Sequence, residues 1–158
     1  MPTEFPPIQE LMPHAGEMVL LSEVLAHSGD ATECAVEVGR DLLHWNTGTS
    51  VPAWVGVELM SQCIAVHGGL LGRASGTPPR IGFLLGSRRI QFTGTDFAPE
   101  QTLTVRARRV WGQEVGMVSF DCEIEDAASG APMLKGRLNC FVPSDADLGD
   151  AQFHGDER

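Results

Sequence analysis

Apolar and polar residues alternate along several short segments of the chain. Alternation with a period of two is typical of a strand with one buried face, and it is clear at residues 31–38 and 101–111. In the second segment Leu103, Val105 and Ala107 alternate with Thr104, Arg106 and Arg108. Four more segments have apolar runs bounded by turn residues, and we predict strands there too: 17–27, 81–92, 115–125 and 133–142. A short helical turn is expected at 7–14.

Residues 52–72 differ from these segments because they are apolar on nearly every side. Pro52 near the start and the glycines near the end, Gly68, Gly69 and Gly72, fit the polarity of a helix. A helix that is apolar all round is buried. The predicted order is two strands, this helix and four strands, which an antiparallel sheet curled around the helix satisfies. The pattern therefore predicts an α+β domain with one long buried helix.

Composition and charge narrow the class of protein. The 158 residues suffice for one domain, expected at 1–143, with an acidic flexible tail at 144–158. The net charge of -10 argues against nucleic-acid binding. The apolar segment contains Glu58, Ser61, Gln62 and His67, which makes it too polar for a comfortable membrane span. The opening residues do not read as a signal peptide, so we expect a cytoplasmic protein.

The four cysteines, Cys34, Cys63, Cys122 and Cys140, lie far apart in the sequence. They form no CxxC pair and no Cys/His spacing typical of a metal site. We interpret them as reduced packing residues and expect no metal.

Glu58 is the residue that points most directly to chemistry. It is a lone carboxylate in the predicted buried helix, so its pKa should rise or a polar neighbour must meet it. Gln62, four residues on, lies on the same helix face and is a candidate for that neighbour. A carboxyl group that keeps its proton near neutral pH can serve as a general acid. The structural alternative is a glutamate favoured by the helix dipole, with its carboxylate reaching solvent or a dimer mate.

His44 lies fourteen residues before Glu58, in the loop that leads to the helix. An imidazole of ordinary pKa is the natural base at neutral pH. Taken alone, this histidine is better explained as a surface or hydrogen-bonded residue than as a catalytic base.

Two motifs connect these residues to a family. Residues 12–24, MPHAGEMVLLSEV, and 51–62, VPAWVGVELMSQ, resemble the LPHRxPFLLVDRV and MPGVLxxEAMAQ signatures of the 3-hydroxyacyl-acyl-carrier-protein dehydratases. The family's catalytic histidine stands eight residues before the proline of the second motif, which is the position of His44. The family's GHFPG loop is changed here to LHWNT at 43–47, and its glycine after the proline is Ala53. With these departures the chain looks most like the divergent dehydratase-like branch of aryl-polyene biosynthesis clusters.

The resemblance implies a hotdog fold, an antiparallel sheet wrapped around one long central helix. It also implies dehydration of a 3-hydroxyacyl thioester to the trans-2-enoyl thioester, as in fatty-acid or polyene biosynthesis. His44 would take the C2 proton and Glu58 would protonate the departing hydroxyl. The backbone N–H of Ala53 would polarise the thioester carbonyl, and we expect Trp54 and Gln62 to contact substrate as well. Family sites form across a dimer interface and need no cofactor.

The expected partners are an acyl carrier protein with its phosphopantetheine-linked chain and a second subunit, identical or related. Arg88 and Arg89 are candidates for carrier docking, since carrier proteins are acidic; a solvated strand end explains them equally well. Two other functions stay open: a non-catalytic subunit of a heterodimer, which the altered loop favours, and a hotdog thioesterase, which we rank last.

Overall fold

The computed structural model describes residues 4–13, 16–39, 50–94 and 96–147. Two 3-10 helices, η1 (Ile8–Glu10) and η2 (Gly16–Met18), precede the strands β1 (Glu23–His27) and β2 (Ala31–Glu37). The helix α1 (Val55–Ala74) follows. Four strands complete the fold: β3 (Phe83–Phe92), β4 (Thr102–Gly112), β5 (Gly116–Asp126) and β6 (Pro132–Val142).

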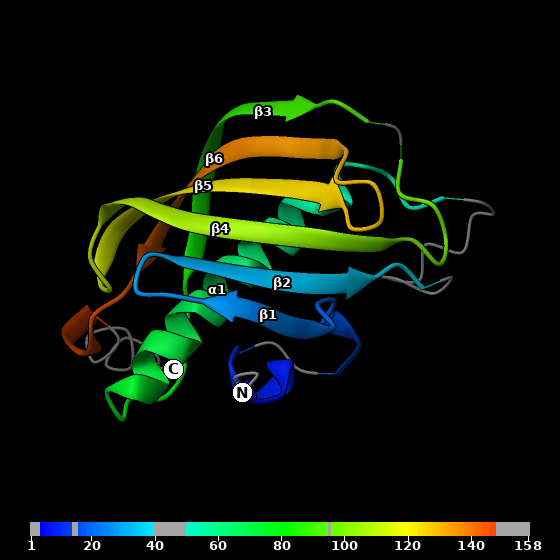
Figure 1. The fold of residues 1–158 in the computed structure, drawn as a ribbon. Coiled ribbons are helices and arrows are strands. Elements are labelled where there is room, and N and C mark those ends of the chain that lie inside the picture. The colour runs from blue at the N-terminus through cyan, green and yellow to red at the C-terminus, as the bar shows by residue number, and fades with distance from the viewer. Residues whose placement is uncertain (1–3, 14–15, 40–49, 95, 148–158) are drawn as a thin grey trace, which may run out of the picture.

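The six strands form one antiparallel sheet in the order β1-β2-β4-β5-β6-β3. The sheet curves around α1, which lies against one of its faces (Figure 1). This is the hotdog arrangement, so the predicted fold is confirmed. The strand β3 lies at an edge of the sheet, where it pairs with β6 on one side only. Its neighbours in the sequence, α1 and β4, do not pair with it.

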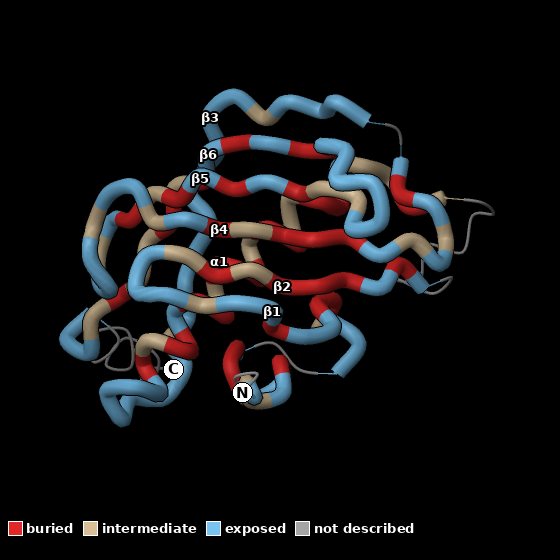
Figure 2. The backbone as a smooth tube through the Cα atoms, in the orientation of Figure 1, coloured by how far each residue is buried: buried red, intermediate tan, exposed pale blue. Residues whose placement is uncertain are grey.

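The core lies between α1 and the sheet, and Figure 2 marks buried residues both along the helix and along the strands that cover it. As the alternation predicts, Leu103, Val105 and Ala107 of β4 are buried against the helix. The helix approaches the sheet closely at Gly56, where a Cβ atom would lie 2.5 Å from Cδ2 of Leu134. All four cysteines are free and buried, so they pack in the core as expected.

Two predicted boundaries are wrong. The predicted strand at 17–27 begins only at Glu23, because Gly16 has a φ of 60° and starts the η2 turn. Leu20 and Leu21 lie before the strand begins, but they are buried and belong to the hydrophobic core. The helix begins at Val55 rather than Pro52, since Val51 forms an antiparallel bridge with Phe97 just before it.

By length and composition α1 could cross a membrane, with a mean hydropathy of 1.2, despite the polar residues that we expected to exclude this. In the fold, 56% of the 18-residue stretch of α1 that has this hydropathy is buried inside the protein, as in the core helix of a globular domain.

Candidate active site

A cavity of ≈ 270 Å³ lies beside α1 and reaches strands β3, β5 and β6. The helix contributes Glu58, Ser61 and His67 to its wall. Apolar side chains line much of the remainder, among them Ile64, Phe83, Phe120 and Val142. An apolar cavity with a few polar groups is the usual form of a site for a small organic ligand.

Glu58 is half-buried in this wall and is held by Gln62. The Nε2 of Gln62 donates to Oε1 of Glu58 at 3.0 Å, so the predicted i,i+4 pairing is confirmed. Gln62 is fully buried and also binds the N-terminal segment: its Oε1 accepts from Leu20 N–H at 2.9 Å and its Nε2 donates to the Met18 carbonyl at 2.6 Å. Gln62 therefore orients Glu58 and does not itself line the cavity.

The N–H of Ala53 lies just before the first turn of α1, where helix N–H groups lack partners within the helix. It donates to Oδ1 of Asp96 at 2.9 Å. The bridge between Val51 and Phe97, with two hydrogen bonds of 2.8 Å, brings Asp96 to this position. The group expected to polarise the thioester carbonyl is thus bonded to a carboxylate. Sequence reasoning missed Asp96, and nothing local in the sequence links residues 43 positions apart.

A second polar cluster lies where α1 crosses β2. The Thr32 hydroxyl is 2.8 Å from Nδ1 of His67 and 2.8 Å from Nδ1 of His27. His67 is only 1% exposed, and its ring meets Phe120 edge-on. Burial, together with the nearby charges of His27 and Arg109, lowers the pKa of His67 to about 4, so the ring is neutral at pH 7.

Nine residues of helix are two and a half turns, which places His67 on the opposite side of α1 from Glu58, and it lines the cavity nonetheless. Trp54 is 55% exposed at the start of α1 and, like Ala53, does not line the cavity. His44 and His14 lie outside the described residues, so the pairing of His44 with Glu58 stays a prediction.

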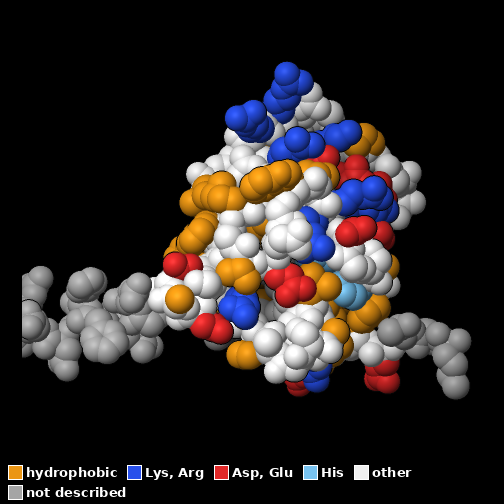
Figure 3. All heavy atoms as spheres, turned by 90° about the vertical axis from the view of Figure 1, so that its left-hand side faces the viewer, with side chains coloured by type: hydrophobic (Ala, Val, Ile, Leu, Met, Phe, Trp, Pro, Cys, Tyr) orange, Lys and Arg blue, Asp and Glu red, His pale blue; other side chains and the backbone are white. Residues whose placement is uncertain are grey.

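Arg88 and Arg89 lie on the exposed edge strand β3. Arg88 stands opposite Arg137 of β6, and the strand pairing shifts between Arg88 and Gln91. Arg89 has a φ of 52° at this irregularity, which is uncommon for a residue with a side chain. Figure 3 shows Lys and Arg side chains gathered beside a band of hydrophobic side chains on one side of the molecule.

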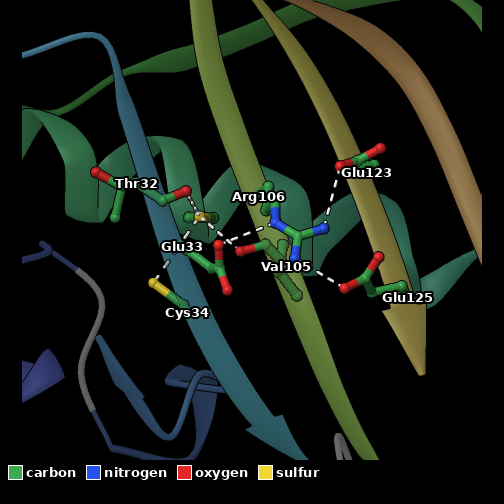
Figure 4. Close-up of polar contacts among 8 residues, drawn as sticks. Thr32, Glu33, Cys34, Val105, Arg106, Glu123 and Glu125 are labelled. Atoms are coloured by element: carbon green, nitrogen blue, oxygen red, sulfur yellow. Dashed lines mark hydrogen bonds and ion pairs between the residues drawn. The ribbon is translucent and has the colours of Figure 1, made fainter. Parts of the chain in front are cut away.

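Arg106 does not belong to a free basic patch, although the sequence groups it with the other arginines. Its guanidinium lies among three carboxylates, Glu33, Glu123 and Glu125, at 2.9, 3.2 and 2.8 Å (Figure 4). Hydrogen bonds to Glu125 and Glu33 raise the pKa of Arg106 further above its usual high value. The alternation predicted its outward direction correctly, but its charge is matched within the sheet.

Among the described residues no three His, Cys, Asp or Glu side chains gather as a metal site would require. The polar side chains in the cavity wall include a carboxyl group at Glu58, hydrogen-bonding groups at Ser61 and His67, and the charged groups of Arg80, Arg109 and Glu114. Such a set suits acid–base chemistry on a largely apolar ligand.

Solved structures that share this hotdog fold include a dehydratase complex and proteins described as thioesterases. Comparison with known proteins is more specific: the profile of the ApeP-like family, described as ApeP dehydratase, matches residues 6–150. The chain belongs to this family. No curated protein sequence matched it.

Solved structures support the same assignment. A chain of "The Dehydratase Heterocomplex ApeI:P" from Xenorhabdus doucetiae is 28% identical, with a TM-score of 0.82, and the match covers 97% of this chain and 100% of that one. A hypothetical thioesterase protein with coenzyme A from Streptococcus pneumoniae TIGR4 is 16% identical, with a TM-score of 0.59 over 77% of this chain and 85% of that one. Zebra fish thioesterase superfamily member 2 is 12% identical, with a TM-score of 0.64 and coverages of 87% and 93%. The latter two show the fold alone.

Proposed function

We propose that this chain takes part in dehydrating 3-hydroxyacyl thioesters carried on the phosphopantetheine arm of an acyl carrier protein, in polyene-type biosynthesis in the cytoplasm. The observation that carries the proposal is Glu58, a carboxyl group held by Gln62 in the wall of a largely apolar cavity. Membership of a dehydratase family agrees with this chemistry.

In the proposed reaction a base removes the C2 proton while Glu58 gives its proton to the 3-hydroxyl. Water leaves, and the C2–C3 double bond forms from the electrons of the broken C–H bond. The base would be His44, which the family resemblance places in this role. Glu58 then regains a proton from solvent, or from the base through water, before the next turnover.

We propose that the working form is a dimer with a related dehydratase subunit. The most similar structure reported above is described as a dehydratase heterocomplex. The edge strand β3 supports such a partner, because Phe83, Leu84 and Leu85 on it are each about half exposed. An edge strand that carries exposed apolar side chains is a template for pairing with another chain.

One observation favours a second function, that of a non-catalytic subunit which shapes the site of its partner. The N–H of Ala53 donates its hydrogen bond to Asp96, so it is not available to a thioester oxygen. The Asp96 carboxylate would also repel the negative charge that develops on that oxygen during the reaction. The partner would then supply the complete catalytic set.

The test compares the chain alone, its partner alone and their complex on 3-hydroxyacyl-carrier substrates, with the enoyl product followed by mass spectrometry. Glu58→Gln in the complex should lower turnover by about 10²–10⁴-fold, because the amide cannot donate an acidic proton. Glu23→Gln, an exposed position on β1, is the matched control and should leave turnover unchanged.

Wild-type turnover by the Glu58→Gln complex would overturn the catalytic role and support the non-catalytic one. Asp96→Ala releases the Ala53 N–H. If the Asp96→Ala chain alone turned over substrate faster than the wild-type chain alone, the Asp96 carboxylate would be identified as the group that suppresses catalysis at this chain's own site.

A further inference from the structure

The free edge of the sheet at β3 combines exposed apolar side chains with unmatched positive charge (Figure 1). Phe83, Leu85 and Phe92 are 53%, 55% and 49% exposed on this strand. Arg88 and Arg89 lie between the last two, and neither has an ion-pair partner in the described part of the chain. Apolar side chains on a free edge strand are typical of a surface that another chain covers.

This edge is basic although the protein as a whole has a net charge of -10. The stretch 81–93, which contains β3, has no Asp or Glu. The neighbouring strand β6 adds cations, because Arg137 stands opposite Arg88 and Lys135 lies two residues away on the same face. Arg137 is matched by Asp121, at 2.7 Å. The charges of the two β3 arginines are not matched in this way.

Two copies of this chain could not neutralise each other at this edge. A pair related by two-fold symmetry uses the same surface on both chains, so β3 would lie against a second β3. Each strand would bring Arg88 and Arg89 and no carboxylate, whatever the register. Both arginines are near the middle of the strand, so an axis through its middle would bring all four together. Like charges on facing strands are destabilising.

A strand that carries carboxylates at the matching positions would fit the same edge. Its acidic side chains would pair with Arg88 and Arg89, while its apolar side chains would cover Phe83 and Leu85. Side chains of paired strands stand on the faces of the sheet, so these ion pairs would form at the surface of the joined sheet and would respond to salt. Charges arranged in this way contribute more to the choice of partner than to affinity.

We propose that Arg88 and Arg89 select the partner subunit: they disfavour a pair of identical chains and favour a related chain whose edge strand carries carboxylates. The inference rests on the proposed function only in taking that partner to be a related dehydratase subunit. It adds the chemistry by which the partner is recognised.

The test needs only this chain, because the double reversal Arg88→Glu, Arg89→Glu makes an acidic version of the same edge. Arg137 faces position 88, so a carboxylate there gains a neighbour of opposite charge and the fold should be retained. Native mass spectrometry separates the two chains by mass and measures pairing in the wild type alone, the variant alone and their mixture. The mixed pair should form roughly tenfold more tightly than either identical pair, since several cross-strand contacts change from repulsive to attractive.

The response to salt is a second measurement, and its sign differs between the pairs. NaCl screens attraction and repulsion alike, so it should weaken the mixed pair and strengthen each identical pair. The wild-type response alone tests the inference should the variant fail to fold. The matched control, Arg73→Glu with Arg108→Glu, makes the same change in net charge at exposed positions of α1 and β4. Mixed with the wild type, it should pair no more tightly than the wild type does alone.

Identical pairs as tight as the mixed pair, a mixed pair that salt strengthens, or no pairing in the mixture would each overturn the inference. The related dehydratase subunit should bind the Arg88→Glu, Arg89→Glu chain about tenfold more weakly than the wild type, and equal binding would also overturn it. Enzyme assays of this variant are made at concentrations where the complex stays assembled, so that effects on substrate are separate from assembly. Pairing that follows the charges, in a complex that dehydrates no substrate, would instead refute the proposed function and leave the selection of the partner standing.

Discussion

Two adjacent glycines of α1, Gly68 and Gly69, differ in what a methyl group at each position would meet. Apart from its chain neighbours and the nearby helix backbone, a Cβ at Gly68 would have no heavy atom within 4 Å. A Cβ at Gly69 would lie 1.9 Å from the carbonyl oxygen of Leu11 and 2.8 Å from its carbon. The glycine therefore allows the N-terminal segment to pack directly on the helix backbone.

The magnitudes follow from this difference. Gly→Ala in a helix interior stabilises by about 1 kcal/mol when nothing obstructs the methyl group, so Gly68→Ala should raise the free energy of unfolding by about that amount. At Gly69 the same gain is opposed by a backbone group that must move by roughly 1 Å or more, and overpacking of this kind costs about 1–3 kcal/mol or more. The segment that must shift contains Ile8 and Leu11, each 1% exposed. Burial of such side chains contributes about 1.5–3 kcal/mol each.

We therefore expect Gly69→Ala to lower the free energy of unfolding by about 2 kcal/mol. The assay is urea unfolding of both variants and the wild type at one protein concentration, with Tm as a second measure. Gly68→Ala should increase Tm and Gly69→Ala should decrease it, by about 2–4 °C per kcal/mol for a chain of this size. If both substitutions changed stability in the same direction, the packing of Leu11 on Gly69 would be refuted.

Three further predictions follow from the charged and titratable groups. Reversing Arg88 and Arg89 to glutamate should raise KM for carrier-bound substrate but not for a short pantetheine analogue, because exposed charges steer association; equal effects on both substrates would place these residues in the cavity instead. The folded pKa of His67, about 4, is below its value of 6.5 in the unfolded chain, so stability is complete above pH 6.5 and is lost as the pH falls toward 4. The loss amounts to about 3 kcal/mol, and urea unfolding across this range should show it in the wild type and much less in His67→Asn; identical pH profiles would contradict the assignment. Arg106→Met leaves three carboxylates close together, so its unfolding midpoint in urea should be lowered most at low salt and recover as NaCl screens the repulsion, while a salt-independent effect would point to lost packing instead.

Local pattern was sufficient to predict most of the fold. The alternation in β4 predicted which side chains face the helix, and the apolar run at 52–72 predicted the central helix. The pattern wrongly predicted a strand at 17–22. Leu20 and Leu21 are buried there although they belong to an irregular segment, and periodicity cannot distinguish such a segment from a strand. That segment is fixed by Gln62, a residue 42 positions away from Leu20.

The site was predictable only in part for the same reason. The i,i+4 relation of Glu58 and Gln62 is local, and the sequence predicts it correctly. The contacts of Asp96 with Ala53 and of His67 with Thr32 join residues 43 and 35 positions apart. Such contacts depend on the strand order and on where the helix crosses the sheet, which no short-range pattern contains.

The ion pairs of Arg106 also bear on how β2 and β4 find their alignment during folding. A slip of one residue would turn Arg106 toward α1 and expose Val105 and its apolar neighbours, so burial alone rejects it. A slip of two residues keeps the inward-facing apolar side chains on the inner face, so burial does not reject it. In the native alignment Arg106 stands opposite Glu33, whereas a slip of two would place it opposite Ala31 or Ala35. Apolar alternation thus rejects a misalignment of these strands by one residue, whereas the ion pair of Arg106 with Glu33 favours the native alignment over a shift of two.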